Sequence, residues 1–273
     1  MSLPSSKRLR GRLVVGVRRG LGTPLRRRVA LASLRRLHRL RRRLAPARYT
    51  DADPFALVSV DPDRIERSLL ESVPNRPQWG RVVDGEWDRE WEPFDERAVP
   101  RGIRERFEDG LPWRETALFD AYVAQLSRFG NAWGHTSLAG FDRRCAAIET
   151  LHESIRTRGY RPRAWADDVP SETLAARVDE VNVDVDREGR LCWRAYGQHR
   201  LAIAKLLDVE TIPVLVHRRH ADWQATREAV RADRAGRASL DHPDLRDLRG
   251  DASRSTSPSR VGEAWSSDRG DRR

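Results

Sequence analysis

Residues 180–216 constrain the fold more than any other stretch of this chain. They begin with the strictly alternating run EVNVDVD, turn at Glu188-Gly189 into RLCWRAY, and end with GQHRLAIAKLLDVETIPVLV. An alternation of period two predicts a β-strand, and a second strand after a glycine turn predicts a β-hairpin. The run after Gly197 has the composition of a helix, and TIPVLV that of a strand. The sequence therefore predicts a hairpin, a helix and a further strand in that order.

The rest of the central region predicts an α+β fold, in which a small mixed β-sheet has flanking helices. Residues 141–158 form a helix whose apolar stripe ends at Gly159, a typical stop signal. Upstream, between residues 50 and 140, the patterns predict the strand FALVSV, a short helix capped by Asp61, a strand into the Asp84-Gly85 turn, and helices over 96–109 and 114–129.

The N-terminal arm, residues 1–48, has a charge unlike that of the rest of the chain. The net charge is +11, yet residues 1–50 hold 16 Lys and Arg and no Asp or Glu, so the remainder is mildly acidic. The arm places leucines at 31, 34, 37, 40 and 44, which predicts an amphipathic helix covered by arginines. Such a helix suits an anionic membrane surface or nucleic acid phosphates, and the well-formed stripe favours the membrane. The alternative is that the leucine stripe packs on the body of the protein itself.

Several classes of protein do not fit the composition. No apolar run approaches the roughly 20 residues that a transmembrane helix needs, and LVVGV at 13–17 is too short for a signal peptide. Cys145 and Cys192 have no metal-ligand spacing, and the sequence suggests no metal site. A reduced, cytoplasmic protein is expected, with peripheral attachment to the membrane through the arm as the alternative. The segment 236–273 is rich in Asp, Arg, Ser, Gly and Pro, which predicts a disordered tail.

The turn at Gly197 is the main candidate site. Glycine allows a close backbone approach, and the N–H groups at the start of the next helix favour an anion. Gln198, His199 and Arg200 follow directly and add donors that suit phosphate oxygens. An ordinary strand-to-helix turn with a surface arginine is the alternative interpretation.

Three motifs in a fixed order resemble the ParB/sulfiredoxin superfamily. They are LHESIRTRG at 151–159, GQHRLAIA at 197–204 and IPV at 212–214, and the resemblance covers about residues 142–220. It implies a ParB/sulfiredoxin-like core at 141–235, with residues 50–140 as an elaboration and the N-terminal helix added to it. It also implies that Gly197, Gln198, His199 and Arg200 cradle the phosphates of ATP, ADP or CTP, with Mg²⁺ as an accompanying ion.

The chain departs from the superfamily pattern in two ways. Sulfiredoxins carry a cysteine in the turn, where this chain has Gln198, and Cys192 falls in the preceding strand, so sulfinate reduction is not expected. Partition proteins of the ParB type continue into a helix-turn-helix domain, whereas about 50 mostly polar residues follow the core here.

Chemistry on a nucleotide requires further groups. Glu180 and Asp184 are the candidate carboxylates for a general base or Mg²⁺, unless they lie on a solvated strand edge. His199 would stabilise transferred charge, and Arg219 and His220 would bind phosphate or a second substrate, or else form a basic loop over Trp223.

The loop at 131–136 is expected to line the far wall of the pocket with Trp79, Gly85 and Trp87, or to serve as core. The resulting function is nucleotide binding, with hydrolysis or phosphotransfer to a small acceptor. The alternatives are a non-catalytic, DNA-associated module that uses the arm, and a peripheral membrane protein of the same fold.

Overall fold

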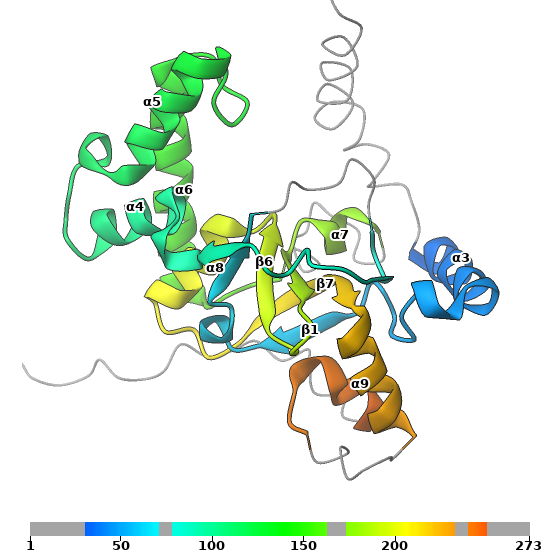
Figure 1. Cartoon of the computed structure of the whole chain (residues 1–273). Coiled ribbons are helices and arrows are strands. Elements are labelled where there is room, and N and C mark those ends of the chain that lie inside the picture. Colours follow the sequence, from blue (N-terminus) through cyan, green and yellow to red (C-terminus); the bar gives the residue numbers. More distant parts are fainter. Residues whose placement is uncertain (1–30, 71–77, 163–172, 233–239, 250–273) are drawn as a thin grey trace, which may run out of the picture.

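A computed structural model describes residues 31–70, 78–162, 173–232 and 240–249 of the chain (Figure 1). The helices in these ranges are α3 (Leu31–Leu44), α4 (Ala98–Phe107), α5 (Ala117–Phe129), α6 (Leu138–Arg158), α7 (Ala175–Val178), α8 (Gln198–Leu206) and α9 (Ala221–Arg231). The strands are β1 (Leu57–Val60), β2 (Arg67–Leu69), β3 (Arg81–Val83), β4 (Trp91–Pro93), β5 (Val181–Val185), β6 (Leu191–Ala195) and β7 (Ile212–His220).

All of these strands belong to one mixed sheet. Its order is β1-β7-β5-β6-β2-β4, and β3 pairs with the second half of β7 on the same side as β1. The hairpin β5–β6 is antiparallel, whereas β5 and β7 are parallel. Parallel strands need a crossover connection, which β6 and α8 provide here. The predicted class, a small mixed sheet with flanking helices, is thus confirmed.

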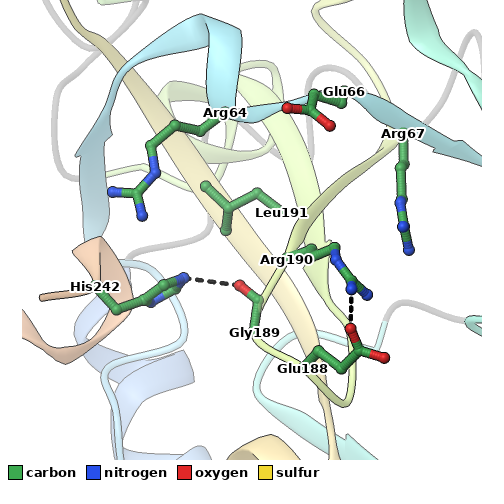
Figure 2. Close-up of a pocket in the computed structure, with 8 residues that line it drawn as sticks. All are labelled: Arg64, Glu66, Arg67, Glu188, Gly189, Arg190, Leu191 and His242. Carbon is green, nitrogen blue, oxygen red and sulfur yellow. Dashed lines mark hydrogen bonds and ion pairs between the residues drawn. The ribbon is translucent and has the colours of Figure 1, made fainter. Parts of the chain in front are cut away.

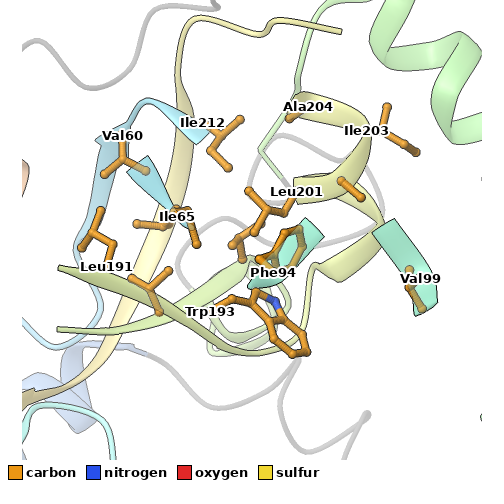
Figure 3. Packing of buried hydrophobic residues seen from close by; sticks show 14 of the residues in the cluster. Val60, Ile65, Phe94, Val99, Leu191, Trp193, Leu201, Ile203, Ala204 and Ile212 are labelled. Atoms are coloured by element: carbon orange, nitrogen blue, oxygen red, sulfur yellow. The ribbon is translucent and has the colours of Figure 1, made fainter. Parts of the chain in front are cut away.

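The main core lies between the sheet and α8. Leu201 of α8 faces Phe94, Ile65 and Trp193 of β6, whereas Ile203 points to the other side of the helix (Figure 3). All five residues are buried and belong to the same cluster. Helices α4 and α6 contact α8 from its other side, and Figure 1 shows α4, α5 and α6 gathered away from α3 and α9. The turn that precedes α8 is therefore held between the sheet and this group of helices.

The region 50–140 is part of the same sheet and core. It supplies β1 to β4, and its residues Val60, Phe94 and Leu118 belong to the cluster that contains Leu201. The predicted Asp61 cap is present, since Asp61 Oδ1 accepts from Asp63 N at 2.8 Å. The short strands β2 and β4 were not expected, because three residues are too few to show an alternation.

Strand β5 is central rather than an edge. It lies between β7 and β6, and every residue from Val181 to Val185 is buried. The interpretation of Glu180 and Asp184 as solvated edge carboxylates is therefore wrong: both side chains are fully buried.

The predicted disorder of the tail is wrong for residues 240–249. These residues include a 3₁₀ helix, η8 (Pro243–Arg249), in which Asp244 and Leu245 are buried. Asp244 accepts from Trp223 Nε1 at 2.9 Å and pairs with Arg219, so long-range partners order a segment that is polar by composition. Residues 236–239 and 250–273 of the predicted tail lie outside the described residues, as do residues 1–30 of the arm.

Candidate functional site

The turn between β6 and α8 has an unusual backbone. Tyr196 and Gly197 both adopt left-handed conformations, with φ of 60° and 66°, and α8 begins at Gln198. A Cβ on Gly197 would lie 2.7 Å from the Cα of Val181, so only glycine fits this close approach to β5. Left-handed conformations of non-glycine residues such as Tyr196 are concentrated at functional sites.

The first N–H groups of α8 make no hydrogen bond within the described part of the chain. Within the described residues, no hydrogen-bond acceptor contacts the backbone N–H of Gln198, His199 or Arg200. The turn is only partly buried, and the side chain of Tyr196 is 46% exposed. Three N–H donors at a helix N-terminus without an acceptor among the described residues, together with the helix dipole, favour an anion at this position.

The guanidinium of Arg200 is fixed by a buried partner. It donates to Glu180 Oε2 at 2.9 Å and to the carbonyl of Asp179, and its side chain remains 16% exposed. Burial lowers the pKa of Arg200, but the neighbouring Tyr160 and Glu180 outweigh burial and raise it. Arg200 is therefore a permanent cation in the first turn of α8, and Glu180 holds its guanidinium in one orientation.

Glu180 does not fit a protein-bound Mg²⁺ site. Its side chain is fully buried, and its Oε2 accepts from both Arg200 and the hydroxyl of Tyr160, the latter at 3.5 Å. The described part of the chain also contains no group of three His, Cys, Asp or Glu side chains that could hold a metal ion. Glu180 therefore fixes the orientation of Arg200 and is not placed as a metal ligand.

His199 is a neutral side chain in this site. Its Nε2 lies 3.1 Å from a guanidinium nitrogen of Arg144 in α6, and Arg144 in turn lies 4.6 Å over the ring of Trp133. Burial, and secondly the charge of Arg144, lower the pKa of His199 to about 3. Nε2 then accepts from Arg144, which leaves the N–H at Nδ1 as a donor. His199 can donate a hydrogen bond to an anion but brings no positive charge.

Arg144 and Tyr160 are site residues that sequence reasoning missed. Arg144 lies in the predicted helix at 141–158 and Tyr160 directly follows its Gly159 stop, so both fall within the stretch that resembles the superfamily. The signal available was the motif spacing alone, which does not say which side chains of a helix face a distant turn. The loop of Trp133 reaches the site through Arg144, but Trp79 packs on Phe55 and Trp87 lies by His220.

The structure does not bring Arg219 and His220 to the turn. In the β5–β7 register, Val181 beside Gly197 pairs with Val214, whereas Arg219 pairs with Val185 at the other end of β5. Arg219 Nε donates to Asp244 at 2.8 Å, and His220 Nε2 lies 2.9 Å from the carbonyl of Gly85. Both residues are buried and engaged by the chain itself.

Asp184 belongs to a second, buried charge cluster. Its Oδ2 accepts from Arg194 at 2.6 Å and from Arg218 at 2.8 Å, and His217 Nδ1 lies 3.4 Å from Oδ1. Burial raises the pKa of Asp184, but His217, Arg194 and Arg218 outweigh it and lower the pKa to about 2. An anionic carboxylate with these partners holds strands β5, β6 and β7 together and is not free to act as a base.

A pocket of about 320 Å³ lies at the opposite end of β6, beside the β5–β6 turn (Figure 2). It is lined by Arg64, Glu66, Arg67, Glu188, Gly189, Arg190, Leu191 and His242. Arg190 pairs with Glu188, and His242 Nε2 lies 2.7 Å from the carbonyl of Gly189. Arginines and carboxylates are mixed on its walls, so the pocket has no marked preference for an anion.

Comparisons of the chain with protein-family models, with curated proteins and with solved structures find no match. Among the described helices, none has the length and apolar character needed to cross a membrane.

Proposed function

We propose that this chain is a nucleotide-binding protein of the ParB/sulfiredoxin type, with the phosphate site at the start of α8. The observation that carries the proposal is the set of three N–H groups, on Gln198, His199 and Arg200, for which the described part of the chain offers no acceptor. The order of motifs around Gly197 supports the same assignment, because the superfamily it resembles uses this turn for the phosphates of ATP, ADP or CTP.

In this proposal each side chain at the turn has a separate part. The N–H groups donate to phosphate oxygens, and the exposed edge of Arg200 adds charge while Glu180 holds its orientation. His199 donates from Nδ1, and Arg144 fixes its tautomer. Any Mg²⁺ that accompanies the nucleotide would be held by the phosphates themselves.

We propose nucleotide binding at this turn and assign no residue as a catalytic base. Hydrolysis or phosphotransfer would need a carboxylate or histidine that can accept a proton. Glu180 is occupied by Arg200, and Asp184 is held by two arginines on β6 and β7. Neither carboxylate is therefore free to activate an acceptor.

Two variants of Gln198 test the proposal. An aspartate in the first turn of a helix stabilises the helix by about 0.3–1 kcal/mol, but its carboxylate would repel a phosphate from the same N–H groups. Isothermal calorimetry with ATP, ADP and CTP in the presence of Mg²⁺ should detect binding of at least one nucleotide by the wild type. Gln198→Asp should weaken that binding at least about tenfold, a loss of about 1.4 kcal/mol.

Gln198→Asn is the matched control, since it has the size of aspartate without the charge. It should bind the nucleotide within about threefold of the wild type, or about 0.7 kcal/mol. The proposal fails if none of the three nucleotides binds, or if Gln198→Asp binds as tightly as Gln198→Asn.

A further inference from the structure

Helix α3 has one face that packs on the protein. Leu31 is fully buried in a small cluster with Phe55 and Leu215, and His38 is buried with its Nε2 3.0 Å from the carbonyl of Thr50. Arg35 and Arg42 reinforce this attachment through Asp53 at 2.7 Å and Glu228 at 3.1 Å. The leucine stripe predicted from the sequence is thus divided, because His38 rather than Leu37 continues the buried face.

Leu34 is half-buried against the same cluster as Leu31, and the last three leucines of α3 form a second stripe that faces away from the body. The side chains of Leu37, Leu40 and Leu44 are 41%, 52% and 77% exposed. At about 100° per residue they lie within a sector of about 60° and extend about 10 Å along the helix axis. Isolated exposed leucines are common on protein surfaces, but three in register on one helix form a continuous apolar strip.

Arginines border this strip on both edges. By the same helical geometry, Arg36 and Arg43 lie along one edge and Arg41 along the other. These side chains are exposed, and none forms an ion pair with the described part of the chain. The sequence of α3 contains no Asp or Glu, so the strip and its borders carry only positive charge.

We propose that this face of α3, defined by Leu37, Leu40, Leu44 and their flanking arginines, docks on an anionic lipid bilayer. A helix lying in the membrane interface buries an apolar strip at the acyl boundary while its arginines contact lipid phosphates. Protein–nucleic acid interfaces are polar and strongly basic, so the leucines would have no apolar counterpart on a duplex. A second copy of the same face would oppose arginine to arginine.

Flotation with lipid vesicles tests this proposal on the full-length chain. Wild-type protein should float with vesicles of phosphatidylcholine mixed with phosphatidylglycerol and not with vesicles of phosphatidylcholine alone. The triple variant Leu37→Ser, Leu40→Ser, Leu44→Ser keeps every arginine, and its bound fraction should fall at least about tenfold because the apolar contribution is removed.

The matched control replaces three other exposed leucines. Leu70, Leu138 and Leu240 are 53%, 42% and 39% exposed and lie outside α3, so their triple change to serine should leave flotation unchanged. The proposal is overturned if the wild type does not bind the anionic vesicles. It is also overturned if the α3 variant binds them as well as the control does, or if the chain binds duplex DNA but not vesicles. This proposal does not depend on the nucleotide site, and Gln198→Asp should float like the wild type.

Discussion

Gly197 shows how a single residue sets the geometry of the candidate site. A side chain there would be in a left-handed conformation, which costs about 1–2 kcal/mol, and its Cβ would overlap the backbone of Val181, which adds about 1–3 kcal/mol. We expect Gly197→Ala to lower the free energy of unfolding by about 2–5 kcal/mol, the sum of these two costs, as measured by urea denaturation.

Gly130 offers a matched control for this substitution. It has nearly the same conformation, with φ of 64°, but a Cβ at this position would meet nothing within 4 Å. Gly130→Ala should therefore lose only the conformational part, about 1–2 kcal/mol. Equal losses in the two variants would mean that the close approach of the turn to β5 is not what requires glycine.

The sequence predicted the turn but not the environment of its side chains. The turn could be predicted from neighbouring residues alone, because a glycine followed by a polar run is typical of a strand-to-helix junction. The neutral state of His199 depends on burial and on Arg144 of α6, and the orientation of Arg200 depends on Glu180, the residue before β5. Both partners are distant in sequence. The residue types alone therefore predict an anion site. The charge state of His199 and the partner of Arg200 can be known only from the structure.

Among the elements, β5 differs most from its prediction, because the sequence predicts a strand with one solvated face. Alternation of valine with polar residues is typical of a strand with one solvated face, yet both faces of β5 are covered. The cause is chemical: Asp184 meets Arg194 from β6 and Arg218 from β7, so the polar face is buried as a network of paired charges. A pattern within one strand cannot reveal partners supplied by two others.

This network predicts a large effect of Asp184 on stability. Asp184→Ala would leave the buried guanidinium groups of Arg194 and Arg218 without their shared carboxylate, at a cost of about 3–5 kcal/mol. Urea denaturation should show this loss, whereas Asp109→Ala, at an exposed position, should change the free energy of unfolding by less than about 0.5 kcal/mol. A change of under about 1 kcal/mol for Asp184→Ala would show that the cluster contributes little to the sheet.

At the scale of the whole molecule, the order of the main elements could be predicted, and their joining into one sheet could not. Local sequence patterns predict the hairpin, α8 and β7. The addition of β1 to β4, the pairing of β3 with β7, and the ordering of residues 240–249 by Arg219 and Trp223 are long-range events. The parallel pairing of β5 with β7 is long-range as well, and its register places Arg219 and His220 at the end of β5 opposite to Gly197.

The central claim is that the backbone N–H groups at the start of α8 bind phosphate, and amide NMR during a titration with ATP and Mg²⁺ tests it most directly. Because a hydrogen bond to an anion deshields the amide proton, we expect downfield shifts for Gln198, His199 and Arg200. The amides of Arg219 and His220, at the other end of the sheet, should not move. Unchanged amides at residues 198–200, or larger shifts at residues 219 and 220, would contradict the account.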